Sequence, residues 1–451
     1  MRATCILAWA LVSGTVLTAA EPTFRAGVAR VVITPSEPMW LAGYAARNRP
    51  AEGAEHDLYA KALALEGPDG RGVILLTSDL LGFDREFSHE VVRQVEQATG
   101  LSRDRLMLTA SHTHCGPVIA DNLFGMYPLP GDMQRKALAY TEKLKDKIVE
   151  VIVRAWRERQ PAVLHHGQGT ARFAVNRRLV TPQGVIGGAN PDGPVDHSVP
   201  VLRVADRNGK LLAVVFGYAC HNTTLQYYKW CGDYAGFAQV ELEQRHPGAT
   251  AMFWAGCGGD VNPLPRSTVE LCRKYGKELA VAVHEVLSSP MTEIRGPIVA
   301  RYEEISLPFA FTPSEEQLRV DAKDSYPARR HRAQRYLRLL AEGKSIPTEY
   351  PHFPVQVWHL GEVCWIALGG EVVVDYALRL KRELAKDRPI WVTAYANDVM
   401  AYIPSERVLA EGGYEGETSM TEYGLPSKWK TGIEDKIIGT TLRLAQGMAA
   451  R

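Results

Sequence analysis

The fold is decided by residues 72–110, whose sequence is GVILLTSDLLGFDREFSHEVVRQVEQATGLSRDRLMLTA. Residues 72–78 form an apolar run typical of a buried strand, and residues 105–110 form a second one. Between them, residues 85–99 have the spacing of an amphipathic helix, which Gly100 ends. A strand, a helix and a second strand in this order predict a crossover connection and a parallel strand pair.

Apolar runs and helical patterns alternate through the rest of the chain. Residues 201–205 and 211–218, joined through Asn208 and Gly209, predict an antiparallel hairpin. Further strands are predicted at 250–255, 355–360, 363–368 and 389–394, and helices at 133–160, 233–245, 266–288, 315–342 and 372–386. The alternation predicts an α/β fold with a mixed, largely parallel sheet flanked by helices. No linker or internal repeat divides the sequence, so residues 21–451 are interpreted as a single domain.

The composition is that of an ordinary globular protein. Of the 451 residues, 46% are hydrophobic, which is enough for a large core. Lysine and arginine total 52 against 51 aspartates and glutamates, so the formal net charge is +1 and nucleic acid is not an expected partner. Residues 329–338 concentrate arginine and could rest on lipid head groups, although such a run is more often a solvated helix face. We expect peripheral membrane contact at most, and the oligomeric state stays open.

The N-terminus has the pattern of an export signal. Arg2 is followed by an uncharged apolar stretch at residues 5–17 and by Thr18-Ala19-Ala20, a small-residue cleavage site. The apolar stretch is shorter than the ~20 residues that span a bilayer, which favours a cleaved signal over a membrane anchor. We therefore expect residues 1–20 to be a signal peptide and the mature protein to be secreted or periplasmic.

Export permits disulfide bonds among the cysteines that follow the signal. These are Cys115, Cys220, Cys231, Cys257, Cys272 and Cys364. Their spacings form no C-x-x-C pair, so we expect buried or disulfide-bonded cysteines rather than metal ligands, and the sequence does not choose a pairing.

Polar residues directly follow five of the predicted strands. At these strand ends lie His112 and His114, then His221, then the glycine-rich turn at 256–263, then Glu371, and finally Tyr402. The carboxyl ends of strands in an open α/β sheet converge on one crevice, and histidine with carboxylate suits zinc. The sequence therefore predicts a metal site at this edge. Each residue alone also has a simpler interpretation, such as a surface histidine pair, a helix cap or a core tyrosine.

Several of these segments resemble the neutral/alkaline, non-lysosomal ceramidase family. Residues 111–117, SHTHCGP, resemble its T-H-T-H-S-G-P motif. The other similarities are ACH at 219–221 to A-x-H, GDVNP at 259–263 to G-D-V-S-P, GE at 370–371 to P-G-E, AYI at 401–403 to G-Y-V, and GYEG at 413–416 to Y-E-G. The likeness runs from about Phe24 to the region of Tyr414, so the chain is similar to the N-terminal catalytic domain of that family.

The resemblance implies a set of roles. His112, His221, Glu371 and Tyr402 would bind one Zn²⁺ ion, and His114 would lie beside the bound water or substrate. Arg177 would contact the substrate, and Asp260 and Asn262 of the turn are the remaining candidate catalytic residues. The implied function is a zinc-dependent amidohydrolase that cleaves the amide of N-acylsphingosine (ceramide), a lipid substrate, by attack of zinc-bound water.

Two departures keep other functions open. Asn262 stands where the family has a serine, and an amide cannot act as an activated hydroxyl nucleophile, although it can donate a hydrogen bond. The sequence also ends soon after Tyr414, so we expect the immunoglobulin-like C-terminal domain of larger ceramidases to be missing. The alternatives are a zinc hydrolase of another amide or ester, such as a cell-wall or polysaccharide acyl group, and a non-catalytic lipid-binding homologue.

Two residues near the predicted site have less certain roles. His56 could reach the cleft, although a structural role is the simpler interpretation. Asp79 ends the strand at 72–78, where it could either orient a ligand histidine or cap the following turn.

Overall fold

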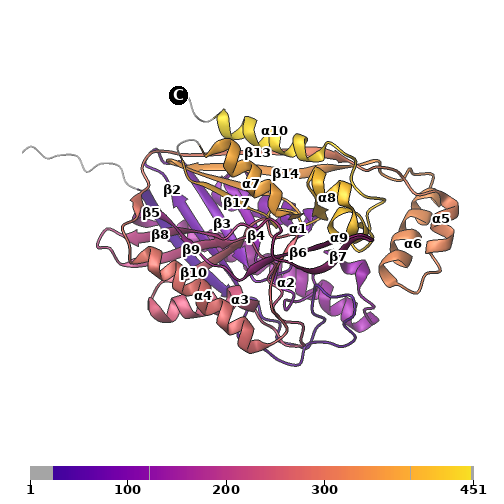
Figure 1. Ribbon diagram of the computed structural model, residues 1–451. Coiled ribbons are helices and arrows are strands. Elements are labelled where there is room, and N and C mark those ends of the chain that lie inside the picture. Colours follow the sequence, from indigo (N-terminus) through magenta and orange to yellow (C-terminus); the bar gives the residue numbers. More distant parts are fainter. Residues whose placement is uncertain (1–23, 121, 386–387, 448–451) are drawn as a thin grey trace, which may run out of the picture.

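The computed structural model describes residues 24–120, 122–385 and 388–447 (Figure 1). The predicted signal peptide at 1–20 lies outside these residues. The strand-helix-strand unit is confirmed as β3 (Gly72–Ser78), α1 (Arg85–Thr99) and β4 (Leu106–Ala110), with β3 and β4 parallel. The helix α1 begins where the Asp84 side chain accepts a hydrogen bond from the Phe87 amide, and it ends at Gly100, whose φ of 75° favours glycine.

The largest sheet has nine strands, in the order β10-β9-β8-β5-β1-β2-β3-β4, with β12 paired to β5. Its other strands are β1 (Phe24–Val32), β2 (Tyr59–Glu66), β5 (Gln160–Thr170), β8 (Ser198–Asp206), β9 (Leu211–Tyr218), β10 (Thr250–Ala255) and β12 (Thr292–Glu293). The mixed α/β architecture is confirmed, as is the predicted hairpin β8–β9, although most strand pairs of this sheet are antiparallel rather than parallel as expected. The parallel pairs β3–β4 and β9–β10 lie at the two edges. Between them the pairs are antiparallel, because short turns such as those after β2 and β8 return the chain directly.

A second sheet packs face to face on the first. It contains β13 (Ile298–Pro308), β14 (Glu349–Leu360), β15 (Val363–Leu368) and β17 (Ile390–Thr393). Four buried tryptophans join the two sheets: Trp254 of β10 contacts Trp365, which contacts Trp358 and Trp391. Large aromatic side chains bury much apolar area, so this layer is a major part of the core.

Helices cover the outer faces of the two sheets (Figure 1). The large sheet is covered by α2 (Gly131–Arg157), α3 (Asp233–Arg245) and α4 (Val269–Leu287), and the second sheet by α7 (Val374–Leu384) and α10 (Ile433–Gln446). The prediction of one helix at 315–342 was wrong. The chain forms α5 (Glu315–Asp321) and α6 (Pro327–Ala341), because Pro327 has no amide hydrogen to continue the first helix and starts a new one.

Two small sheets and two bridges bring the strand ends together. One sheet is β11 (Val261–Pro263), β6 (Ala174–Thr181) and β7 (Gly184–Asn190); the other is β16 (Glu371–Val372) with β18 (Tyr402–Ile403). Isolated bridges join Thr109 to Ala396 and Gly256 to Thr393. The carboxyl ends of β4 and β10 therefore meet the carboxyl end of β17.

The remaining expectations concern the surface and the cysteines. None of the helices in residues 24–120, 122–385 and 388–447 combines the length and apolar character needed to cross a membrane. On α6, Arg329 and Arg332 form ion pairs with Asp324 and Asp321, so part of its positive charge is neutralised within the protein. In the part of the chain that the structure describes, the six cysteines are buried and none is disulfide-bonded. Of the two predicted alternatives, buried free cysteines are therefore the correct one.

Candidate metal centre

His112 is held in an uncommon backbone conformation just after β4. Its φ is 59°, in the left-handed region that residues with a side chain rarely adopt. Its Nδ1 lies 2.7 Å from the Leu81 carbonyl oxygen. Because a carbonyl can only accept, Nδ1 carries the hydrogen and Nε2 presents a lone pair. The backbone strain therefore serves to aim one imidazole lone pair into the centre.

His221 follows β9 and is oriented in the same way. Its Nδ1 donates to the Gly258 carbonyl oxygen at 2.6 Å, so its Nε2 is also a lone pair. Burial, followed by the nearby charge of Arg177, lowers the pKa of His221 to about 4. The ring is therefore neutral at pH 7, which is the form that binds a metal.

Glu371 and Tyr402 face each other directly across the parallel pair β16–β18. Glu371 Oε2 lies 3.0 Å from Nε2 of His112 and 3.0 Å from Nε2 of His221, and the Tyr402 hydroxyl lies 3.2 Å from the same His221 atom. The four predicted ligands therefore converge on one point.

The donor set fits a cation. The lone pairs on Nε2 of His112 and His221 face an ionised carboxylate oxygen, so three acceptors meet without a hydrogen between them. Ligand atoms about 2.0–2.1 Å from a tetrahedral zinc lie about 3.3 Å apart, close to the separations of 3.0 to 3.2 Å here. Two imidazoles, a carboxylate and a phenol oxygen are ligands that zinc accepts.

His114 lies at the edge of this group. Its Nε2 is 3.2 Å from Nε2 of His112, and the imidazoles of His112, His114 and His221 alone are close enough together to hold a metal ion. Burial and the two neighbouring histidines lower the pKa of His114 well below its usual value. Gly43 makes room for the ring, because a Cβ at that position would lie 2.3 Å from His114 Nδ1. His114 is thus a neutral base beside the centre.

Arg177 connects the centre to the glycine-rich turn. Its guanidinium donates to the Tyr402 hydroxyl at 3.0 Å, to Asn262 Oδ1 at 3.2 Å and to Glu415 Oε1 at 2.7 Å. Burial opposes the charge of Arg177, but Tyr402 and Glu415 outweigh it and raise the arginine's pKa. The structure therefore brings Arg177 and Asn262 beside the four convergent residues.

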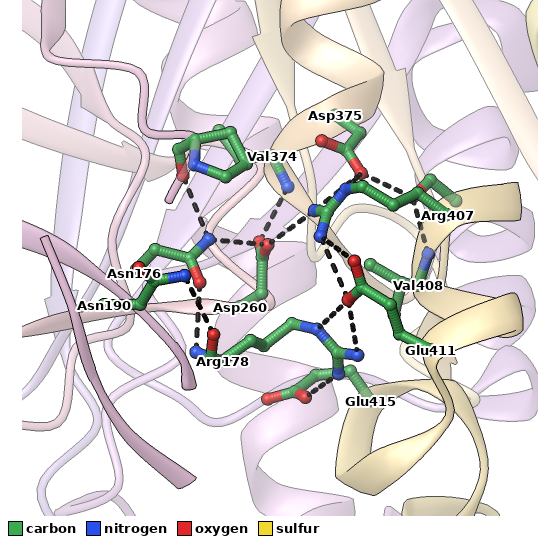
Figure 2. Close-up of polar contacts among 12 residues, drawn as sticks. Asn176, Arg178, Asn190, Asp260, Val374, Asp375, Arg407, Val408, Glu411 and Glu415 are labelled. Carbon is green, nitrogen blue, oxygen red and sulfur yellow. Dashed lines mark hydrogen bonds and ion pairs between the residues drawn. The ribbon is translucent and has the colours of Figure 1, made fainter. Parts of the chain in front are cut away.

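Asp260 is placed differently, in a polar network with Asn176, Val374 and Arg407 (Figure 2). Its carboxylate accepts from the Val374 amide at 2.8 Å and from Asn176 Nδ2 at 3.0 Å, and Arg407 lies 3.9 Å away. Burial raises the pKa of Asp260 to about 6. These contacts fix the turn to the start of α7 and to β6, and they do not include the histidines.

Arg178 is the second charge in this network (Figure 2). It is 1% exposed and binds Glu415 Oε2 at 2.5 Å and Glu411 Oε2 at 3.0 Å. Glu415 therefore holds Arg177 with one oxygen and Arg178 with the other. Burial would raise the pKa of Glu415, but the two arginines outweigh it and lower the pKa.

Sequence reasoning missed two residues of the site. The Tyr423 hydroxyl donates to Glu371 Oε1, so it fixes the carboxylate whose other oxygen faces the histidines. Tyr423 follows a 3₁₀ turn rather than a strand, so the strand-end rule does not find it. Glu415 lies within the GYEG segment at 413–416 and was accessible from that motif, but no role was assigned to it.

The two less certain residues lie outside the centre. Asp79 accepts from the Tyr59 amide at 2.9 Å and from Gln239 at 3.3 Å, so it neither orients a ligand histidine nor caps the following turn. The cap was predicted wrongly, because both oxygens of the Asp79 carboxylate accept hydrogen bonds from Tyr59 and Gln239 and not from the turn that follows. His56 lies 3.4 Å from Cys231 Sγ, so the structural interpretation of this histidine is correct.

A cavity of about 400 Å³ is lined in part by Tyr423, the hydrogen-bond partner of Glu371. Tyr423 is in its wall, together with Leu123, Phe309, Met400 and Asp398. Burial raises the pKa of Asp398 to about 7, although a hydrogen bond from the Tyr350 hydroxyl opposes the shift. The wall also includes charged residues, Asp84, Arg85, Glu86, Arg335 and Glu349, and only its apolar part is suited to a hydrocarbon chain.

Asp398 makes stability depend on pH. Its folded-state pKa of about 7 exceeds the ordinary 3.8, so its contribution to stability is complete at low pH and is lost as the pH rises through 7. We expect Asp398→Asn to gain about 2 kcal/mol relative to the wild type between pH 5 and pH 8. Urea unfolding at both pH values measures this, and Asp146→Asn on the exposed face of α2 is the control. Equal pH dependence in wild type and Asp398→Asn would contradict the assignment.

Comparison with known proteins places this geometry in context. Residues 24–302 match the family model described as neutral/alkaline non-lysosomal ceramidase, N-terminal. That segment includes His112, Arg177, His221 and Asn262, whereas Glu371 and Tyr402 lie beyond it.

The chain is also similar to curated relatives. It is 25% identical to a neutral ceramidase of Pseudomonas aeruginosa over 307 residues, which cover 62% of this chain and 44% of that protein. It is 26% identical to neutral ceramidase A of Dictyostelium discoideum over 252 residues, which cover 50% of this chain and 34% of that protein. The matched region thus spans less than half the length of either relative.

Solved structures show the same fold. The crystal structure of the neutral ceramidase from Pseudomonas aeruginosa superimposes with a TM-score of 0.72 at 20% identity, covering 96% of this chain and 76% of that one. A ceramidase complexed with C2 gives a TM-score of 0.72 at 19% identity, covering 94% and 75%. The shared fold extends over the strands that carry Glu371 and Tyr402.

Proposed function

Because the chain belongs to the neutral/alkaline non-lysosomal ceramidase family, we propose that it is a zinc-dependent hydrolase of the amide bond in an N-acylated lipid. The substrate that the family implies is N-acylsphingosine. The observation that carries the proposal is the convergence of His112, His221, Glu371 and Tyr402 from four separate strand ends, with their ligand atoms 3.0 to 3.2 Å apart.

These four residues would hold the ion. Zinc, when bound, supplies a Lewis acid for the amide carbonyl and hydroxide at neutral pH. Tyr423 and the Leu81 and Gly258 carbonyls fix the orientation of the ligands, as hydrogen-bonded partners of metal ligands generally do. Arg177 keeps the Tyr402 oxygen directed into the centre.

The other polar residues would handle the substrate. His114 Nε2, neutral and next to the centre, accepts a proton from the attacking water and passes it to the departing amine nitrogen. Asn262 donates a hydrogen bond to the substrate from its amide nitrogen. Asp260 acts indirectly in this scheme, because it holds the turn that carries Asn262.

The neighbouring cavities support a lipid substrate. The 400 Å³ cavity reaches Tyr423, one hydrogen bond away from Glu371, and its apolar part would accommodate an acyl chain. We further propose that residues 21–451 act as one exported catalytic domain, since the ligands come from both sheets, and that contact with a membrane is peripheral at most.

Asn262 favours a second candidate. The serine hydroxyl of the family motif is replaced by the Asn262 amide, so the groups that the turn offers to a substrate differ from those of the family. A zinc hydrolase of another amide or ester is consistent with that change.

The experiment is metal analysis of the purified full chain together with a substrate panel. We expect about one zinc per chain and release of fatty acid from N-acyl amides, with ceramide among them. A chain that purifies without zinc from metal-replete medium would contradict the proposed centre. Cleavage of acetyl esters or cell-wall amides without cleavage of N-acyl lipids would establish the second candidate instead.

A further inference from the structure

A cavity of about 350 Å³ adjoins the centre on the side of the glycine-rich turn. Its wall includes Arg177, Asn262, Arg266 and Tyr414, together with small and apolar residues of β7. Arg177 donates to the Tyr402 hydroxyl, and the ring centroids of Tyr414 and Tyr402 are 5.3 Å apart. A substrate group in this cavity would therefore be next to the reacting amide.

Arg266 contributes a charge to this cavity that the protein does not neutralise. In the described ranges its guanidinium forms no ion pair, and its one hydrogen bond is a long one of 3.4 Å to the Thr223 carbonyl oxygen. The single carboxylate in the wall, Glu415, is already shared by Arg177 and Arg178. The cavity therefore carries an excess positive charge.

The charge of Arg266 also acts on Tyr44, which packs against His114. Burial raises the pKa of the Tyr44 hydroxyl, and the charge of Arg266 is the largest effect opposing that rise. The Tyr44 ring in turn lies 4.7 Å from the ring of His114. The guanidinium thus acts electrostatically on a residue in contact with the proposed base.

Asn262 adds a directed donor to the same cavity. Its Oδ1 accepts hydrogen bonds from Arg177 at 3.2 Å and from Thr223 Oγ1 at 3.4 Å. With the oxygen engaged, the Nδ2 group has both hydrogens free of any acceptor among residues that the structure describes. A serine here would offer a hydroxyl that also accepts, whereas this amide presents only donors.

We propose that Arg266 and the Asn262 amide form a subsite for an anionic group, a carboxylate or a phosphate, on the amine half of the substrate. This deepens the proposed function and rests on it. A guanidinium and an amide N–H are the donors that bind such anions by charge-assisted hydrogen bonds. Hydrolysis breaks the amide C–N bond, adds the hydroxyl of water to the acyl carbon and its proton to the nitrogen, and releases a fatty acid and an anionic amine.

The first test is turnover by the zinc-loaded full chain. The substrates are N-octanoylglycine, O-phospho-N-octanoylethanolamine and the neutral N-octanoylethanolamine, so the carboxylate and phosphate arms identify the preferred anion. We expect kcat/KM to favour at least one anionic substrate, and Arg266→Gln to reduce that preference about tenfold. Arg266→Lys should retain part of it. Arg273→Gln is the matched control, because Arg273 is exposed on α4 and pairs with Glu55.

The second test measures binding without chemistry. Analogues with a methylene in place of the amide nitrogen cannot be hydrolysed, and calorimetry compares the N-octanoylglycine analogue with its neutral primary amide. We expect the carboxylate analogue to bind about tenfold more tightly to the wild type and to Arg273→Gln, but not to Arg266→Gln. Equal affinities in the wild type, no binding of either analogue, or an advantage that survives in Arg266→Gln overturns the subsite. Preferential binding of the carboxylate analogue without turnover of any amide would contradict the hydrolase function and leave the subsite supported.

Discussion

His221→Ala is expected to abolish zinc binding and to lower kcat/KM for an N-acyl amide by roughly a thousandfold or more. The His221 side chain is fully buried and its Nε2 faces both Glu371 and Tyr402. No other side chain takes its place as a ligand when it is removed. Removal leaves three of the four proposed ligands, His112, Glu371 and Tyr402, and opens the position that the second imidazole filled. Zinc content by mass spectrometry and initial rates measure the two effects together.

His246→Ala is the matched control for this prediction. His246 ends α3 and contacts His284 at 3.2 Å, away from the centre, so its loss should change neither zinc content nor rate. Full zinc occupancy in His221→Ala would show that the ion sits elsewhere. Loss of activity with zinc retained would instead assign His221 to substrate rather than to metal.

Arg178→Ala is expected to cost about 3–5 kcal/mol in the free energy of unfolding, because the buried Glu415 loses one of its two arginine partners and its Oε2 is left unpaired. Arg178 is 1% exposed, and Glu415, which it binds at 2.5 Å, is 4% exposed. The same change removes the contact that fixes one oxygen of Glu415, and the other oxygen positions Arg177 beside Tyr402 and Asn262. KM should therefore rise as well. Urea denaturation and steady-state kinetics on the folded variant separate the two effects.

Arg407→Ala provides the comparison within the same network. Its side chain is 39% exposed and pairs with Asp375 and Glu411 at the surface, so solvent screens the interaction and the expected loss is about 1 kcal/mol or less. Similar losses in Arg407→Ala and Arg178→Ala would mean that burial does not set the strength of this network.

Local sequence patterns predicted the helices and strands that have a regular apolar periodicity and recognisable end residues. The helix at 85–99 agrees residue for residue, because Asp84 and Gly100 mark its ends. The strand β7 was not predicted, since glycines and largely exposed positions leave it without an apolar periodicity. Nor did any pattern indicate the stacking of the two sheets, which depends on tryptophans far apart in the chain, such as Trp254 and Trp365.

The residues of the candidate site likewise divide into those that local patterns predicted and those that they did not. The strand-end rule and the family motifs named the four convergent residues, because His112, His221 and Glu371 directly follow recognisable apolar runs and Tyr402 lies in a family-like segment further on. They did not separate Arg177, which reaches the centre, from Asp260, which bonds to Val374 and Asn176 instead. That distinction depends on side-chain direction. Tyr423 required tertiary structure altogether, since its contact with Glu371 joins segments that no local pattern connects.

The origin of the ligands on separate strand ends has a consequence for maturation. His112 and Tyr402 occupy opposite halves of the polypeptide, and they meet only after the second sheet has docked on the first. The four residues are not brought together in the unfolded chain, so binding of the proposed zinc would stabilise the folded protein by mass action. Chains that fold where zinc is scarce would reach a native-like state that unfolds more easily. The zinc concentration would then set the lifetime of the folded protein.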